Sequence, residues 1–378
     1  MTHAIDRVGL WSPGGGTERS IVVHRFGTAG ADPKVYLQGG LHANEAPGML
    51  ILHHLIPLLR DADKAGRVCG EIVVVPEANP IGMGQFVHGY QSGRYDFTSG
   101  VNFNRQIPLI GDAAVAKMAD ALTVRSEQNV AHARAAMREI VSARRASLES
   151  EFLKNTLLGM AIDADIVIDC HSAGSAMLHV LVWHANWPEG GDLVAQLGAP
   201  LALVIADSGG GTFEEACASP WDALGDAYPD AFPVRPSFVG GLELRGDSDT
   251  DDAIVAADAA NLFRFLQRRG AIGGNPGPSP AMIAKIAPME SIDVIRAPGA
   301  GIVVYRESLG AMLQPGDIVA DLVDPSNADP AATRTPIRTT QGGLLFAMAP
   351  HRVVASGHHV AMVAGGSGSV SGAHPWID

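Results

Sequence analysis

Apolar residues along the first two thirds of the chain fall into short runs that glycine, proline and asparagine interrupt. Runs with the length and β-branched content of buried strands lie at residues 20–26, 34–38, 71–75, 166–168, 180–183 and 201–205. Longer stretches with the composition of helices lie between or after them, at residues 49–60, 112–158 and 252–269. Strands that alternate with helices predict an α/β fold, in which helices flank a mixed, mostly parallel sheet.

The predicted helices and the long connection between them carry further signals. Residues 112–158 contain neither glycine nor proline, and we expect two helices there. Pro57 is expected to interrupt or bend the helix at 49–60. Residues 76–108 are rich in glycine, proline and asparagine and predict a long ordered loop. Loops of this length in a compact domain are usually functional.

The sequence changes character after residue 272. Residues 273–280 read Gly-Gly-Asn-Pro-Gly-Pro-Ser-Pro, which is typical of a linker. Beyond it, short apolar pieces alternate with turns such as Pro315-Gly316, a pattern that predicts a small all-β domain. We therefore predict an α/β domain over residues 1–272, a β-rich domain over 281–365 and a flexible tail over 366–378.

Composition and charge exclude several classes of protein. The 378 residues are enough for two domains, and a formal net charge of −13 argues against a nucleic-acid partner. Three cysteines do not form a disulfide framework. Charged residues interrupt the first twenty positions, so we expect no secretory signal, and the absence of a long uncharged apolar run predicts no membrane span. We expect a cytoplasmic protein without a membrane partner, and its oligomeric state, a homo-oligomer included, stays open.

Two predicted strands end in residues that bind metal ions. His42 and Glu45 lie on the turn after the strand at 34–38, and His171 ends the apolar run that begins at 166. Two imidazoles and one carboxylate are a ligand set of catalytic zinc sites, in which a further position stays open for water. A histidine and a glutamate three residues apart also occur by chance on helix surfaces. The preceding strand, the Gly-Gly pair and the second strand-end histidine favour a metal site.

Four motifs together resemble a known family. They are Gly-Gly-Leu-His-Ala-Asn-Glu at 39–45, Asn-Phe-Asn-Arg-Gln-Ile-Pro at 102–108, Asp-Cys-His-Ser at 169–172 and Gly-Leu-Glu-Leu-Arg-Gly at 241–246. In this order and spacing they resemble the succinylglutamate desuccinylase/aspartoacylase family, whose catalytic domain is similar to zinc carboxypeptidases. The resemblance covers roughly residues 20–350, including the β-rich part, which in that family lies beside the active site and narrows it.

The resemblance implies roles for individual residues. His42, Glu45 and His171 match the ligands of one zinc ion per chain. Glu243 matches the general base, which takes a proton from zinc-bound water and passes it to the leaving amine. Taken alone, the position of Glu243 favours an ordinary edge-strand carboxylate, and only the combined pattern indicates the base.

Three further residues match positions that contact the substrate. Asn104 and Arg105 match the pair that holds a substrate carboxylate, a role that suits a guanidinium. Arg94 resembles the arginine placed against the scissile carbonyl oxygen. The chain departs from the family at Ala43, where the usual residue is glycine and the turn backbone is expected to differ. It also has a long helical insert between Arg105 and His171, which is expected to change the rim of the pocket.

These observations predict a zinc-dependent amidohydrolase that removes an N-acyl group from a small amino acid or a similar amine with a carboxylate. The alternatives are a zinc carboxypeptidase acting on short peptides and a metal-free binding protein on the same scaffold. The acidic residues 247–252 favour a substrate with a second, positive charge. Their spacing also resembles a calcium loop, but a helix start explains most of them better. Residues 207–210 imitate a serine-protease motif without its histidine partner. Lipoyl-like motifs near 300 and 315 lack the lysine of a carrier.

Overall fold

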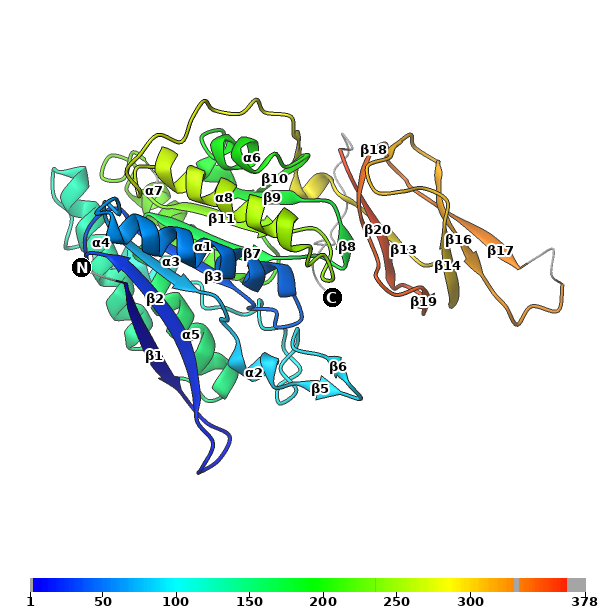
Figure 1. Ribbon diagram of the computed structural model, residues 1–378, viewed down its shortest axis with the longest axis horizontal. Helices are drawn as coiled ribbons and strands as arrows, with labels where there is room; N and C mark the ends of the chain where they lie inside the picture. The colour runs from blue at the N-terminus through cyan, green and yellow to red at the C-terminus, as the bar shows by residue number, and fades with distance from the viewer. Residues whose placement is uncertain (1–2, 235, 330–332, 366–378) are drawn as a thin grey trace.

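A computed structural model describes residues 3–234, 236–329 and 333–365 of the chain (Figure 1). The predicted tail at 366–378 lies outside the described residues. The first part of the chain is built on a nine-stranded sheet with helices on both faces, as predicted. In spatial order its strands are β1 Ala4–Leu10, β2 Arg19–Gly27, β4 Glu71–Val75, β3 Lys34–Gly39, β7 Ile166–His171, β11 Phe238–Glu243, β9 His179–Trp183, β10 Leu201–Ile205 and β12 Lys285–Pro288.

The sheet is mixed and mostly parallel. The pairs β1–β2, β2–β4 and β9–β11 are antiparallel, and the remaining neighbours run parallel. Alternate residues of the central strands enter different hydrophobic cores on its two faces. Tyr36 and Val73 contribute to one core, and Leu37 and Val74 to the other, as the alternation of side chains along a strand requires.

Eight α-helices occur in the described residues. They are α1 Ala46–Lys64, α2 Pro80–Met83, α3 Gly111–Met118, α4 Ser126–Ser142, α5 Glu149–Ala161, α6 Gly191–Leu197, α7 Phe213–Ala227 and α8 Asp252–Arg268. Helices α1, α6 and α8 cover one face of the sheet, and α3, α4, α5 and α7 cover the other (Figure 1). None of these helices has both the length and the apolar character needed to cross a membrane.

The helices differ from the sequence expectations in three places. Helix α1 continues through Pro57, so the helix is not interrupted there. The segment at 112–158 forms three helices and not two, because a turn closed by hydrogen bonds between Thr123 and Asn129 separates α3 from α4. The pattern does not predict α7, which contains Pro220 and begins at the side-chain cap of Thr212. The long loop at 76–108 contains α2 and a small hairpin of β5 Phe86–Val87 and β6 Tyr90–Gln91.

The C-terminal part forms two antiparallel sheets around a core of its own, as the turn-rich sequence predicts. One sheet has the order β13 Asp293–Arg296, β20 His359–Ala364, β18 Gly343–Met348 and β15 Met312–Leu313, with β8 Ser175–Ala176 also paired to β18. The other has the order β17 Arg334–Arg338, β16 Ile318–Val323, β14 Gly301–Tyr305 and β19 Val353–Val354. Two short 3₁₀ helices lie at His184–Asn186 and Met289–Ser291.

Two strands tie the halves of the molecule together. Strand β8 follows β7 by only a few residues and pairs with β18 of the C-terminal sheet. Strand β12 lies beyond the proline-rich connection at 273–280 and pairs with β10 of the large sheet. The boundaries of the α/β domain at residue 272 and of the β-rich domain at residue 281 remain predictions from the sequence.

The strand register assembles one edge of the large sheet. Glu243 at the end of β11 is the direct partner of His171 at the end of β7. On the other side of β7, Gly39 at the end of β3 is paired with Cys170. Three parallel strands therefore end together, at the edge where α/β proteins bind ligands.

Candidate metal centre and substrate cavity

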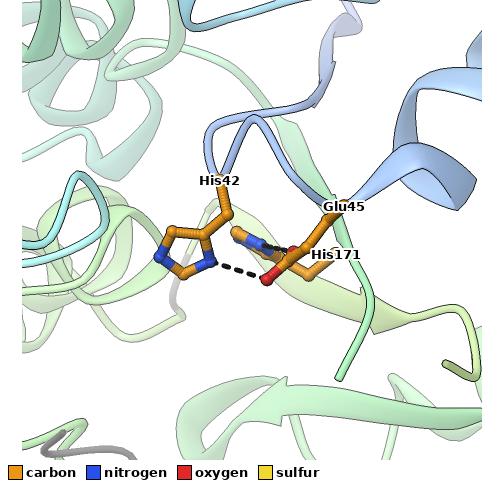
Figure 2. A group of neighbouring side chains, drawn as sticks. All are labelled: His42, Glu45 and His171. Carbon is orange, nitrogen blue, oxygen red and sulfur yellow. Dashed lines mark hydrogen bonds and ion pairs between the residues drawn. The ribbon is translucent and has the colours of Figure 1, made fainter. Parts of the chain in front are cut away.

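The three predicted metal ligands meet at this edge (Figure 2). Glu45 lies between the two histidines, with Oε1 2.9 Å from Nδ1 of His42 and Oε2 2.8 Å from Nδ1 of His171. All three side chains are buried, with exposed fractions of 4%, 1% and 3% for His42, Glu45 and His171. The structure thus confirms that the residues predicted from separate motifs form one group.

Close backbone packing brings Glu45 to His171. Glu45 is the residue immediately before α1, and Gly48 in the first turn of that helix lies against Cys170 of β7. A Cβ atom on Gly48 would overlap the Cys170 carbonyl oxygen, and one on Gly39 would overlap the Gly48 carbonyl oxygen. Glycine at both positions therefore allows the helix start to approach the strand end.

The outer ring nitrogens of both histidines have acceptor partners. Nε2 of His42 lies 2.7 Å from Oδ1 of Asn102, and Nε2 of His171 lies 3.0 Å from Oδ2 of Asp169. Both acceptors favour a proton on Nε2, which leaves the Nδ1 lone pair of a neutral ring directed at the Glu45 carboxylate. A cation at that point resolves the contact between lone pairs, so the residues fit a metal ion held by two imidazoles and a carboxylate.

The charges near the two histidines affect them differently. Burial, together with the Arg94 guanidinium, lowers the pKa of His42 to about 4, so this ring is neutral. Burial also opposes the charged form of His171, but the neighbouring Asp169 and Glu45 carboxylates together raise its pKa well above the usual value.

Glu243 projects into a cavity of about 430 Å³ beside the three ligands. Its Oε2 atom is buried and has no hydrogen-bond partner among the described residues. Burial is the largest cause that raises the pKa of Glu243 to about 8, and the nearby Glu45 carboxylate adds to it. A carboxyl group with a raised pKa beside a metal site is suited to accept and return a proton near neutral pH.

The predicted substrate-contacting residues line the same cavity. Arg94 donates from Nη1 to Oε1 of Glu45 at 2.8 Å, so it lies directly at the ligand group. Asn104 places Nδ2 3.2 Å from Nε2 of His171 and accepts a hydrogen bond from the backbone of Phe213. Arg105 donates from Nη1 to the carbonyl oxygen of Asn104 at 2.7 Å. Their roles toward a substrate stay predictions.

The comparison with protein families agrees with this geometry. The sequence profile of the succinylglutamate desuccinylase/aspartoacylase catalytic domain matches residues 31–225, which is more than half of the chain. The chain belongs to this family. No curated relative matches it in sequence.

Solved structures of similar fold extend the likeness to the whole chain. A protein assigned to this family from Shewanella frigidimarina has 25% identity and a TM-score of 0.84, and the match covers 96% of this chain and 98% of that one. One from Shewanella amazonensis has 24% identity and a TM-score of 0.83, with the same coverage. The product-bound ectoine utilization protein EutE (DoeB) from Ruegeria pomeroyi has 18% identity and a TM-score of 0.66, and the match covers 95% and 96% of the two chains.

The family departure at Ala43 is accommodated by two glycines. Ala43 does not have a positive φ, and its backbone nitrogen donates to the Gly93 carbonyl oxygen at 3.1 Å. A Cβ atom on Gly93 would lie 2.7 Å from the Cβ atom of Ala43, and one on Gly82 would lie 2.9 Å from it. The absence of side chains at 82 and 93 leaves room for the extra methyl group next to Arg94.

Several residues of the site were not predicted from the sequence. Asn102 and Asp169 each precede a predicted site residue by two positions, so the alternation along an extended segment is a signal that could have found them. Glu214 also lines the cavity, as does Asp247, the first of the acidic residues 247–252 that the sequence did indicate. Burial raises the pKa of Asp247 to about 6, with Glu45 adding to the shift. The C-terminal sheet and its loops contribute lining residues that no motif indicates: Ala347, Met348, Pro350, His351, His359 and Met362.

The motif that resembles a calcium loop and the one that resembles a serine-protease site both have structural roles. Asp251 caps α8 by accepting from the backbone nitrogens of Ala253 and Ile254, as a helix start requires. The turn after Asp207 aligns with the segment that carries Arg105, since Gln106 and Ile107 donate to the carbonyl oxygens of Gly210 and Gly211. A Cβ atom on Gly210 would lie 2.8 Å from Cδ of Arg105, so this glycine makes room for the arginine.

Proposed function

We propose that this protein is a metal-dependent amidohydrolase that removes an N-acyl group from a small amino acid or a similar amine with a carboxylate. The main support is the position of Glu243, whose Oε2 has no hydrogen-bond partner in the described part of the chain, beside the buried group of His42, Glu45 and His171. Membership of the family supports the same class of reaction. A zinc ion held by these three residues would make a water molecule more acidic and polarise the acyl carbonyl group.

The chain's own residues supply the remaining functions. Arg105 and Asn104 bind the substrate carboxylate and orient the amide in the cavity. Arg94, fixed by its hydrogen bond to Glu45, directs positive charge toward the acyl oxygen. Glu243 takes a proton from the attacking water and transfers it to the amide nitrogen. The carbon–nitrogen bond then breaks, and the products are a carboxylic acid and an amine.

Two observations favour a small acyl amino acid over a peptide. The cavity volume of about 430 Å³ suits a small molecule. Met348, Pro350 and His351 from the C-terminal sheet and the loop after it form part of the cavity wall. A peptide would need an open groove at this side.

A metal analysis with one matched variant tests the proposal. We expect purified protein to carry about one zinc per chain. Glu243→Gln keeps the shape of the side chain but removes the proton acceptor, so the variant should retain zinc and lose roughly 10²-fold or more in kcat. Full activity in this variant contradicts the role of Glu243, and loss of zinc reassigns it as a ligand. Protein that takes up no metal after zinc treatment favours the binding-protein alternative, and faster cleavage of dipeptides than of N-acetyl amino acids favours a carboxypeptidase.

A further inference from the structure

The floor of the cavity carries a buried carboxylate that the proposed reaction does not use. Gly241 and Glu243 lie on the same face of β11, because they are two residues apart along the strand. A Cβ atom on Gly241 would lie 2.9 Å from Oε1 of Glu214. The glycine therefore leaves the space that the Glu214 carboxylate occupies, next to Glu243 in the cavity lining.

Glu214 is held in place by the start of α7. Thr212 caps this helix by accepting a hydrogen bond from the backbone nitrogen of Glu215 at 3.3 Å. Glu214 follows in the first helical turn and is only 6% exposed. The positive end of the helix offsets part of the free energy needed to bury its charge.

Among the described residues, the basic groups of the cavity form no close ion pair with Glu214, although the Arg105 guanidinium is near enough to interact with its charge. Arg94 is hydrogen-bonded to Glu45. In the described part of the chain, no lysine or arginine forms an ion pair with Glu214. The nearest ion-pair contact is Nε2 of His171 at 4.0 Å, and this nitrogen lies closer to Asp169, at 3.0 Å. A buried carboxylate is stabilised by a paired cation, and a ligand in the cavity can supply one.

Asp247, the remaining acidic group in the lining, is held by hydrogen bonds from a different segment. Its Oδ1 accepts a hydrogen bond from the hydroxyl of Ser172 at 3.0 Å, and the backbone nitrogen of Asp247 donates to the Gly174 carbonyl oxygen. It is thus anchored to the segment after β7. Glu214 lies on α7, which begins next to the turn that aligns with the Arg105 segment. A ligand that spans Arg105 and Glu214 meets one positive and one negative group.

We propose that Glu214 determines substrate specificity by binding an ammonium group on the amine half of the substrate, so that the substrates are N-acyl derivatives of diamino acids. This inference rests on the proposed function, in which Arg105 binds the carboxylate of the same amino acid. The substrate is then held by opposite charges at two points, and its amide lies between them and the metal ligands.

A competing use of Glu214 is metal binding. Asp169, His171 and Glu214 are close enough to form a second group of metal ligands. In that case a metal ion, and not a substrate ammonium, would neutralise Glu214, and removal of its charge would release an ion from the protein.

A comparison of isosteric substrates tests the inference. Nα-acetylornithine and Nα-acetylnorleucine have side chains of the same length, and only the first ends in an ammonium group. We expect wild-type kcat/KM to be about tenfold or more higher for the ornithine derivative. Glu214→Gln should abolish this preference and leave the norleucine derivative within about threefold. Asp226→Asn removes one negative charge from the exposed part of α7 and should change neither value.

A binding measurement separates this inference from the proposed function. Zinc-loaded protein is titrated calorimetrically with free ornithine and free norleucine, which requires no turnover. Tighter binding of ornithine that Glu214→Gln loses supports the inference, even if no N-acetyl amino acid is hydrolysed and the proposed function fails. Equal binding, or binding of neither, overturns it. Loss of a zinc equivalent in Glu214→Gln, measured by elemental analysis, also overturns it and assigns Glu214 to a metal site.

Discussion

At the scale of single residues, Asn102 connects the candidate metal centre to the substrate loop, the segment at 102–108 that carries Asn104 and Arg105. Its Oδ1 accepts from Nε2 of His42 and from the backbone nitrogen of Asn104, at 2.7 and 2.8 Å. Asn102→Ala removes both contacts and should weaken zinc affinity about 10- to 100-fold, as measured by competition with a chelator. Asn102→Asp keeps the acceptor oxygen and should bind zinc at least as tightly as wild type. Equal affinity in all three proteins would show that Asn102 does not orient His42.

At the scale of secondary-structure elements, α5 supports the substrate loop through one buried lysine. Lys154 is 4% exposed, and its Nζ donates to the carbonyl oxygens of Arg105 at 2.7 Å and Asn102 at 3.3 Å. Lys154→Met removes this donor from both oxygens, although the Asn102 oxygen still accepts from the backbone nitrogen of Arg105. The substitution should lower the free energy of unfolding by about 1–3 kcal/mol in urea. It should also raise KM more than it lowers kcat, because Arg105 is less well held.

Helix α3 offers the matched control for this prediction. Lys117 forms an exposed ion pair with Glu139, with 44% of the Lys117 side chain exposed. Lys117→Met should change the free energy of unfolding by about 0.5 kcal/mol or less and leave KM unchanged. An equal effect of the two substitutions would contradict a specific role for Lys154.

At the scale of the whole molecule, the C-terminal sheet closes the cavity through a contact at Gly174. This residue has a φ of +44°, and a Cβ atom there would lie 2.9 Å from Cδ of Pro350, which lines the cavity. Gly174→Ala therefore strains the backbone and also displaces the cavity wall. We expect a loss of about 1–3 kcal/mol in stability and a rise in KM.

Gly316 separates the two effects. It has a φ of +89°, and a Cβ atom there would have no neighbour within 4 Å. Gly316→Ala should lower the melting temperature through backbone strain alone and leave KM unchanged. If both alanine variants change KM equally, the contact between Gly174 and Pro350 does not shape the cavity.

The sequence by itself determined the α/β fold, the β-rich C-terminal part and the three residues of the candidate metal centre. Local patterns carry this information, because strand ends such as Gly39 and His171 follow apolar runs whose period and length are readable. The helix boundaries were less predictable. Thr123 and Asn129 divide a segment that has no glycine or proline, and α7 continues through Pro220.

Only the tertiary structure decided what surrounds the metal centre. Glu214 enters the cavity because Gly241, on the neighbouring strand β11, lacks a side chain, and Pro350 reaches it because β8 pairs with β18. The raised pKa of Glu243 likewise arises from burial and from Glu45, about 200 residues earlier in the chain. Such neighbours are set by the packing of whole elements against one another, and no local pattern of residues encodes them.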